Sequence, residues 1–152
     1  MRTFKTLSGA VNELQPGDVI EIRSSERLPI QLAEPVMKPL AIRAGAGYRP
    51  WLVFAAPEKC EINAGLSVEG CDLDLRSGLL DAINQKSTWR FHRCRIWGDL
   101  HAGITKLRFS DSVLISIYGM YTPPDGTETD YEFDNCLIRQ GHVLIRNREK
   151  IT

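Results

Sequence analysis

The chain has 152 residues, enough for one domain or for one segment of a longer repeat array. Hydrophobic residues make up 43% and charged residues 25%, which excludes a disordered tail, a collagen-like chain and a disulfide-dense miniprotein. Nineteen Lys and Arg balance nineteen Asp and Glu, and this zero net charge predicts no nucleic-acid partner and no membrane contact. No apolar run approaches the roughly 20 residues of a membrane helix, and residues 1–5 lack the apolar core of a secretory signal.

The N-terminal residues predict one short capping helix over residues 6–15. Thr6 or Ser8 can serve as its N-cap, Pro16-Gly17 ends it, and apolar residues recur at helical spacing between them: Leu7, Ala10, Val11 and Leu14. After this helix the chain changes to short alternating apolar runs between Gly, Pro, Asp and Asn, which predicts strands and no second helix. The first three runs are residues 19–22, 28–32 and 40–42.

The strongest feature of the sequence is an internal repeat of eight residues. Four copies align without gaps, and their first residues are separated by 23, 18 and 24 positions: Leu66–Leu73, Trp89–Ile96, Leu107–Leu114 and Tyr131–Ile138. The first position is always large and apolar, the third is Val or Phe, the sixth is Cys or Ser, and the eighth is Leu or Ile. Positions one and three therefore alternate as inward residues of one strand, and positions six and eight as those of a second strand.

The fifth position of this repeat predicts a bend, because the inward residues change parity between positions three and six. Gly70, Asp111 and Asn135 occupy it in three copies, and these residue types tolerate a left-handed backbone, whereas Arg93 is the exception. Coils of about 21 residues, with short strands bent at small or polar residues, are typical of a right-handed parallel β-helix. We expect an all-β solenoid of about six coils behind the N-terminal capping helix.

A second set of apolar residues has nearly the same period. Five isoleucines are separated by 22, 20, 21 and 21 residues, so we expect them to stack at one strand spacing, about 4.8 Å: Ile20, Ile42, Ile62, Ile83 and Ile104. Trp89 and Tyr131 stand at an inward position and are expected in the core. The other predicted inward residues come from the repeat: Cys71, Cys94, Ser112, Cys136, Phe91, Phe109 and Phe133.

The four cysteines stand at positions 60, 71, 94 and 136 and include no Cys-x-x-Cys pair, so neither a zinc ribbon nor a thioredoxin-like site is predicted. We expect Cys71, Cys94 and Cys136 to form an interior ladder with Ser112, as reduced thiols. Neighbouring strands lie within the Cα range of a disulfide, so geometry alone does not forbid a Cys71–Cys94 bond.

Several segments resemble pectin-lyase-like β-helices. Residues 14–22 resemble the opening of those proteins after their capping helix, residues 38–50 resemble the following coil, and Phe91–Cys94 and Phe133–Cys136 resemble their recurrent strand-bend-strand unit. More narrowly, the combination is similar to β-helix regions that follow the kinase domain in large bacterial serine/threonine kinases of planctomycete type. The resemblance covers most of residues 6–147. It implies one part of a multidomain chain, in the extracytoplasmic region of a membrane-anchored parent.

The catalytic residues of the superfamily's enzymes are only partly matched in this sequence. Gly141-His142 and a following Arg148-Glu149-Lys150 are present, but an Asp-Asp pair is not, and no kinase motif occurs. Asp72 and Asp74 point outward from one strand, and the equivalents of Asp72 in the other copies add no carboxylate: Arg95, Val113 and Leu137. We therefore expect both aspartates on the solvated surface, with no calcium or other metal site, no cofactor and no catalytic residue.

Outward positions two and four of the repeat predict a polar face. Opposite charges on it, such as Arg108 and Glu132, can pair between neighbouring strands. Alternatively the face binds a polysaccharide or a protein ligand, or it is catalytic with His92 and either Glu69 or Asp134 as acid and base. The two columns are Ser67, Arg90, Arg108 and Glu132, and Glu69, His92, Ser110 and Asp134.

Aromatic residues outside the inward positions add to this hypothesis. Trp51, Trp97, Tyr118 and Tyr121 can stack on sugar rings or anchor a partner, or they pack under a loop. Residues 118–130 form the longest insertion and the predicted functional loop. The binding candidates are therefore Arg90, His92, Arg108, Glu132, Asp134, Tyr118 and Tyr121.

Two functions remain open at this point. The favoured one is a non-catalytic binding or scaffold module of a larger protein, because the charges on the polar face can neutralise one another. The alternative is a polysaccharide lyase or glycoside hydrolase, which needs two acid/base groups with separated pKa values, usually in a cleft. Ile145 and Ile151 reach the end of the sequence without a predicted cap, so we also expect further domains of a parent chain, or end-to-end self-association.

Overall fold

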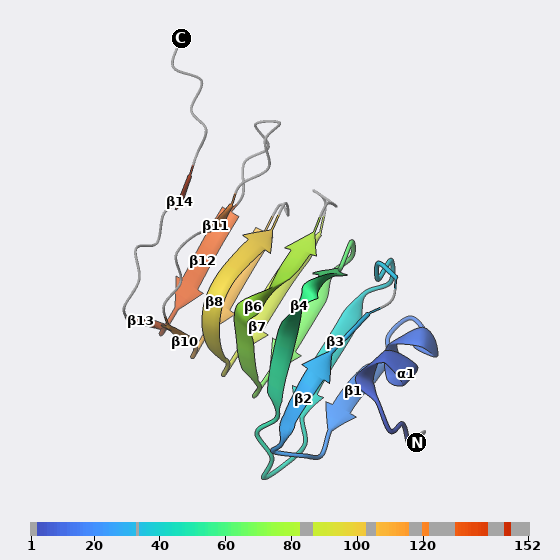
Figure 1. Ribbon diagram of the computed structural model, residues 1–152. Helices are drawn as coiled ribbons and strands as arrows, with labels where there is room; N and C mark the ends of the chain where they lie inside the picture. The colour runs from blue at the N-terminus through green and yellow to red at the C-terminus, as the bar shows by residue number, and fades with distance from the viewer. Residues whose placement is uncertain are drawn as a thin grey trace.

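The computed structural model describes residues 3–32, 34–82, 87–102, 106–115, 120–121, 130–139 and 145–146. These residues form a parallel β-solenoid with one short helix at its N-terminal end (Figure 1). The predicted all-β parallel solenoid with an N-terminal capping helix is therefore confirmed. Most of the long insertion at residues 118–130, and Gly141-His142, lie outside the described residues.

The strands belong to two parallel sheets, which the chain visits alternately. Sheet A has the order β1 (Val19–Ile22), β3 (Leu40–Ala44), β5 (Leu66–Glu69), β7 (Thr88–His92), β9 (Lys106–Ser110) and β12 (Asp130–Asp134). Sheet B has the order β2 (Arg27–Ile30), β4 (Trp51–Glu61), β6 (Asp72–Ala82), β8 (Arg95–Ala102), β10 (Val113–Ile115) and β13 (Leu137–Arg139). Two short strands continue sheet B beyond β8, namely β11 (Met120–Tyr121) and β14 (Ile145–Arg146).

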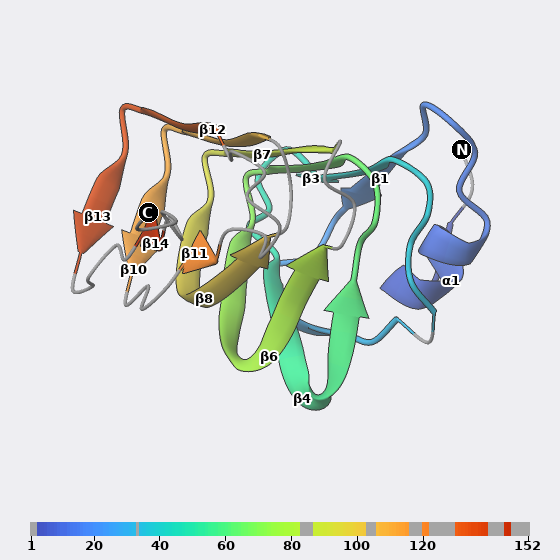
Figure 2. The same ribbon diagram turned by 90° about the horizontal axis from the view of Figure 1, so that it is seen from above.

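The solenoid comprises about four full turns, slightly fewer than the six predicted. The four levels from β3/β4 to β9/β10 have neighbours on both sides in each sheet, whereas β1/β2 and β12/β13 end the described sheets. Figure 2 shows sheet A edge-on, with β4 and β6 curving away from it and turning a corner. The register between β6 and β8 shifts at that corner, between Leu75 and Leu80.

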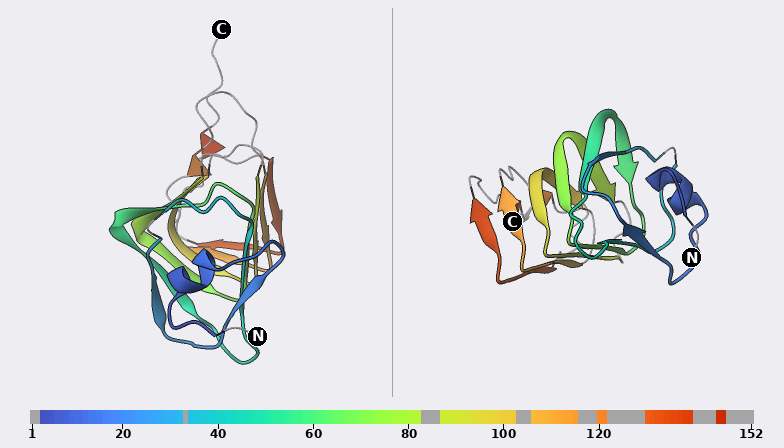
Figure 3. Two further views of the ribbon diagram at one scale, coloured as in Figure 1. Left: turned by 90° about the vertical axis from the view of Figure 1, so that its right-hand side faces the viewer. Right: turned by 90° about the horizontal axis from the view of Figure 1, so that it is seen from below.

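The predicted N-terminal helix is present as α1 (Leu7–Asn12) and is shorter than residues 6–15. Thr6 is its N-cap, because the Thr6 hydroxyl oxygen accepts a hydrogen bond of 3.1 Å from the Gly9 amide. Val11 and Leu14 are buried in the same core cluster as the strands. Viewed along the solenoid, α1 lies across the end of the coils (Figure 3, left). It therefore covers apolar side chains that the first coil would otherwise expose.

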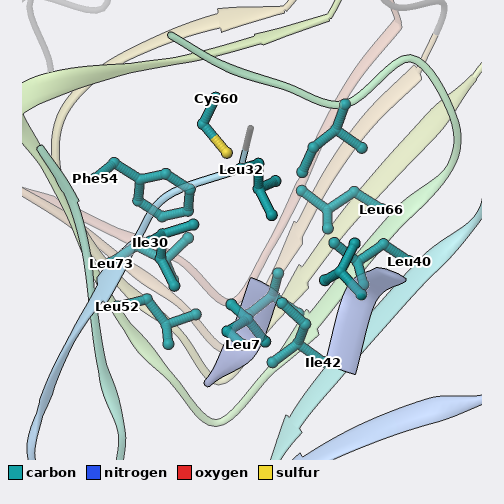
Figure 4. Close-up of a pocket in the computed structure, with 13 residues that line it drawn as sticks. Leu7, Ile30, Leu32, Leu40, Ile42, Leu52, Phe54, Cys60, Leu66 and Leu73 are labelled. Atoms are coloured by element: carbon teal, nitrogen blue, oxygen red, sulfur yellow. The ribbon is translucent and has the colours of Figure 1, made fainter. Parts of the chain in front are cut away.

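The interior is closely packed around columns of side chains from successive coils. The cavity in Figure 4 is lined by Leu7 of α1 and by strand residues such as Ile42 and Leu73, and it measures about 10 Å³. That volume barely accommodates one water molecule, and its lining is apolar, so we expect no ordered water in this cavity. Trp89 is fully buried as predicted, and its indole N–H donates a hydrogen bond of 3.0 Å to the Ala64 carbonyl.

The predicted column of five isoleucines is wrong. Ile20 does pair with Ile42, but Ile42 is followed by Val68, whereas Ile62 bridges to Val36. The reason is that coil length varies, and the coil from Ile42 to Val68 is longer than the assumed period. Ile83 and Ile104 lie outside the described residues. The observed column is Ile20, Ile42, Val68, Phe91, Phe109 and Phe133.

The other residues predicted to point inward are buried in the middle of the solenoid and are more exposed at its two ends. Cys71 and Cys94 are 0% exposed and Ser112 is 1% exposed, and the Ser112 hydroxyl oxygen accepts a hydrogen bond of 3.1 Å from the Cys94 amide. Ile20 and Cys136 are only partly buried, and Phe133 is exposed. Those residues belong to the first and last levels of the sheets, where one side has no neighbouring strand among the described residues.

The bend predicted at the fifth repeat position is confirmed in all four copies. Gly70, Arg93, Asp111 and Asn135 have φ values of 71°, 53°, 48° and 49°, all in the left-handed region. Asn135 also donates a side-chain hydrogen bond of 2.6 Å to the Asp111 carboxylate, so the bend residues stack from coil to coil. Arginine has no intrinsic preference for this conformation, so Arg93 adopts it because the surrounding coil requires it.

Replacing Arg93 with asparagine should therefore stabilise the protein. Asparagine adopts a positive φ more readily, and we expect the free energy of unfolding to rise by about 0.5–1 kcal/mol in denaturant titrations. The Arg93 carbonyl, which accepts a hydrogen bond from Arg49, is retained in the variant. Arg90→Asn is the matched control, because Arg90 is also exposed but lies in β7 without a positive φ. An equal gain in both variants would contradict the explanation.

Candidate functional site

The two outward columns predicted on sheet A are present in the expected register. Each residue pairs with its predicted equivalent on the next strand, so the side chains project from one face of β5, β7, β9 and β12. The first column is Ser67, Arg90, Arg108 and Glu132, and the second is Glu69, His92, Ser110 and Asp134. The structure therefore brings five of the seven binding candidates onto one face: Arg90, His92, Arg108, Glu132 and Asp134.

Opposite charges on this face are paired between neighbouring strands. Arg108 Nε lies 2.8 Å from Glu132 Oε2, and Lys106 Nζ lies 2.8 Å from Asp130 Oδ2. All four side chains are at least one-third exposed, so each pair contributes at most about 1 kcal/mol to the free energy of unfolding. Arg90 is exposed and stands beside Arg108 in the column. The face is therefore a largely neutralised surface with a local cationic position at Arg90.

His92 has neighbours that superficially match a nucleophilic triad. Its Nδ1 lies 2.9 Å from the Ser110 hydroxyl and 3.7 Å from Asp111 Oδ2. In a working triad the serine and the carboxylate contact opposite nitrogens of the imidazole, so that one nitrogen takes the proton while the other is held. Here both groups approach the same nitrogen. The arrangement orients His92 on the face but does not activate Ser110.

The described part of the structure places neither tyrosine candidate on this face. Tyr121 lies in β11, which pairs with β8 of sheet B, so its strand belongs to a different side of the coil from Arg90. Tyr118 lies outside the described residues. Of the predicted site, the structure therefore shows the charged columns of sheet A. Most of the loop at residues 118–130 lies outside the described residues.

The prediction that Asp72 and Asp74 are solvated surface residues is wrong. Both point outward on either side of inward Leu73, as expected, yet each is only 4% exposed. Asp72 is enclosed by two arginines: Arg49 Nε lies 2.7 Å from its Oδ1, and Arg95 donates to both carboxylate oxygens, at 2.8 and 2.5 Å. The carboxylate is buried because long arginine side chains from neighbouring coils cover it.

Asp74 is enclosed in the same way by Arg76 and Arg27. Arg76 Nε and Nη2 donate to the two carboxylate oxygens at 2.8 and 2.7 Å, and Arg27 Nη2 lies 3.4 Å away. The hydrogen bonds from Arg76 lower the pKa of Asp74 below its ordinary value, and the charge of Arg27 acts in the same direction. Asp74 therefore remains ionised at neutral pH and is unsuited to act as a general acid.

Two tryptophans complete this cluster over sheet B. The rings of Trp51 and Trp97 stack with centroids 5.5 Å apart, although one strand, β6, lies between their own strands. The rings meet because Asp72 and Asp74, the β6 residues in register between them, are short. Arg27 lies over Trp51, with its guanidinium carbon 4.9 Å from the ring centroid, as in a cation–π contact. The two tryptophans therefore pack on each other, an arrangement that none of the predictions for them included.

Most of this cluster could not be predicted from the sequence, because all of its partners except Arg76 come from different coils. Arg49 stands 23 residues before Asp72, and Arg95 stands 23 residues after it. The register that places Arg95 next to Asp72 follows from the repeat, but the repeat does not include the segment with Arg49 and Trp51. Two arginines for each carboxylate leave the cluster with a formal charge of about two positive units, which makes it a cationic structural patch.

Other features that could mark a site are limited in the described part of the chain. No group of three or more His, Cys, Asp or Glu residues is arranged to hold a metal ion there. Within the same residues no helix is both long enough and apolar enough to span a bilayer. A surface groove of about 500 Å³ lies between α1 and residues 31–32 and 34–38, and Met37 and Lys38 are among the residues that line it. Neither Met37 nor Lys38 belongs to the two columns of sheet A.

Comparisons with known proteins were made at three levels. No family model, no curated protein and no solved structure matches this chain. The functional argument therefore depends on the geometry of this chain and on the general chemistry of its side chains.

The cysteines give a direct test of the interior. Burial raises the pKa of Cys60 and Cys71 to about 12 and that of Cys94 to about 11, and these three thiols are buried. Cys136 is only partly buried. We expect a disulfide reagent at pH 8 to react quickly with Cys136 alone, and with four thiols after denaturation. Cys136→Ser should remove the fast reaction, whereas fewer than four thiols in denaturant without reductant would contradict the reduced state.

Proposed function

We propose that this chain is a non-catalytic binding or scaffold module, and that sheet A is its binding face. The observation that carries the proposal is the alignment of charged and polar side chains on successive strands, with Arg90 and His92 accessible at its centre. Parallel strands about 4.8 Å apart hold these groups at fixed spacing, so little conformational entropy is lost when a ligand binds. A polysaccharide or an extended protein segment fits such a flat, periodic surface.

The arrangement of acidic groups favours binding over catalysis. Glycoside hydrolysis uses two carboxyl groups whose pKa values are separated by their environments. Glu132 is paired with Arg108, and Asp130 is paired with Lys106. The two buried carboxylates, Asp72 and Asp74, are each held by two arginines on the other sheet. None of these four groups is presented as a free acid or base beside His92.

The proposed context is a larger multidomain bacterial protein, such as a serine/threonine kinase, in which this module senses a ligand or docks a partner. The support for that context is the resemblance of the coil-opening and strand-bend-strand segments described above. A short solenoid with a helix over one end suits a role as one part of a longer chain. No cofactor is required for such a role.

The proposal is tested by measuring binding and turnover on the same substrates. A glycan array that includes acidic polysaccharides is screened first, and positive ligands are then assayed for reducing ends and for unsaturated products. We expect binding without turnover, and we expect Arg90→Ala to weaken binding at least severalfold because it removes the central exposed charge. Arg23→Ala is the matched control, since Arg23 is also exposed but lies outside the columns.

Turnover would favour the alternative, a carbohydrate-active enzyme that uses this face. If product forms and His92→Ala or Asp134→Ala abolishes its formation, the non-catalytic proposal is overturned. If a ligand binds equally well to the wild type and to Arg90→Ala, the binding face lies elsewhere on the solenoid.

A further inference from the structure

The last coil exposes apolar side chains that the same repeat positions bury elsewhere. Phe133 is 37% exposed, whereas Phe91 and Phe109 at the same position are each 1% exposed. Ile138 is 41% exposed, whereas Leu114 at the equivalent position is 0% exposed. The last coil thus has the composition of an interior coil but lacks a covering layer among the described residues. Its side chains are suited to receive another strand.

The backbone edge of this coil is also open in the part of the chain that the structure describes. β12 pairs only with β9, and β13 pairs only with β10, whereas an interior strand such as β7 pairs with both β5 and β9. Figure 1 shows β12 and β13 at the end of the solenoid opposite α1. The unpaired N–H and C=O groups of such an edge are a template for adding an extended segment by β-augmentation.

The outward charges of β12 indicate what kind of segment fits. All three of its outward positions are acidic: Asp130, Glu132 and Asp134. The preceding strand presents Lys106 and Arg108 to the first two, so opposite charges already alternate between these coils. Asp130 and Glu132 nevertheless keep more than half of their side chains exposed, at 61% and 53%. A following strand with basic residues at its outward positions would continue the alternation.

A second copy of the chain does not provide this complement through its own end strands. Two copies that met at β12 would bring acidic side chains against acidic side chains. The opposite end of a copy presents β1, whose outward residues Val19 and Glu21 are not basic, and Glu21 is already paired with Arg23 and Arg43. In addition, α1 covers that end. The charges therefore favour a different partner over end-to-end self-association.

We propose that the β12–β13 edge binds an extended protein segment in which basic and apolar residues alternate, paired in parallel with β12. The basic side chains would lie beside Asp130, Glu132 and Asp134, and the apolar ones would cover Phe133 and its neighbours. Such a segment extends the solenoid by one strand, as each coil already does for the one before it. This interaction uses the open backbone edge of β12, which the proposed ligand face of sheet A does not use, although Glu132 and Asp134 belong to both.

The test uses synthetic peptides as defined probes, with binding followed by fluorescence anisotropy. The first peptide alternates Lys with Ile and Phe, the second carries Glu in place of Lys, and the third has the composition of the first with its lysines grouped together. We expect the first peptide to bind more tightly than either of the others, and salt to weaken its binding. Equal binding of the alternating and grouped peptides would overturn the proposal, because strand pairing requires the alternation.

Variants of the edge complete the test. The triple variant Asp130→Asn, Glu132→Gln and Asp134→Asn should bind the first peptide about tenfold more weakly. Phe133→Ser should also weaken it, because the apolar side chains of the peptide are proposed to cover this partly exposed ring. Glu26→Gln, at an exposed turn, should have no effect. Unchanged binding in the triple variant would overturn the proposal, as would a concentration-dependent dimer that the same triple variant abolishes, since the occupant would then be a second copy.

Discussion

Replacing Phe109 with alanine should reduce the free energy of unfolding by about 3–5 kcal/mol. Phe109 is 1% exposed and lies between two other phenylalanine rings of its column, at centroid distances of 5.3 Å from Phe91 and 5.2 Å from Phe133. The substitution leaves a cavity in the middle of the solenoid and removes both ring contacts at once. The loss is measured by urea titration followed by circular dichroism.

Phe133→Ala is the matched control for this prediction. It makes the same substitution in the same column, but Phe133 is 37% exposed and has a described aromatic neighbour on one side only. We expect a loss less than about half of that for Phe109→Ala, because much less apolar surface is returned to water. Equal losses would mean that the column is as well covered at β12 as at β9, contrary to the structure.

Replacing Gly98 with alanine should cost about 2–5 kcal/mol, from backbone strain and overpacking together. Gly98 has φ of 95°, and a Cβ atom there would lie 2.7 Å from the Arg76 amide nitrogen and 2.7 Å from the Leu75 carbonyl carbon. These are backbone atoms of the neighbouring coil, so no side-chain rotation relieves the clash. The position matters because β6 and β8 separate at this corner, immediately after the pairing of Leu75 with Gly98.

Gly47→Ala separates the two contributions in that prediction. Gly47 has a similar φ of 81°, but nothing lies within 4 Å of the position where its Cβ would be. Its substitution should therefore cost only the left-handed strain, about 1–2 kcal/mol. If denaturant titrations give the same loss for both glycines, the close approach of the two coils at Gly98 is not a determinant of stability.

The repeat was sufficient to predict the parts of the structure that recur in every coil. Inward positions one, three, six and eight, the bend at position five and the register of both outward columns all follow from strand periodicity and the stacking of equal coils. Arg93 follows the repeat even though its residue type does not favour the bend. Its side chain contradicts the local preference, yet its backbone adopts the same left-handed conformation as Gly70 and Asn135.

What could not be predicted is where coils differ in length and where side chains reach between them. The isoleucine spacing suggested one column, but a longer coil shifts Ile62 to the strand end that bridges Val36. The burial of Asp72 depends on arginines from two other coils that fold over it. The alternation of the strand correctly predicts that Asp72 and Asp74 point outward. It does not predict their burial, because alternation carries no information about which side chains cover the outer face of the sheet.

The central claim is that the coils stack in parallel and in register, since this alignment creates both the aromatic column and the binding face of sheet A. Nuclear Overhauser contacts between side chains of β7 and β9 in an isotopically labelled sample test it most directly. Parallel pairing predicts contacts from Trp89 to Leu107 and from Phe91 to Phe109. Contacts from Trp89 to Phe109 and from Phe91 to Leu107 instead would show antiparallel pairing, and would contradict the solenoid and the face proposed to bind a ligand.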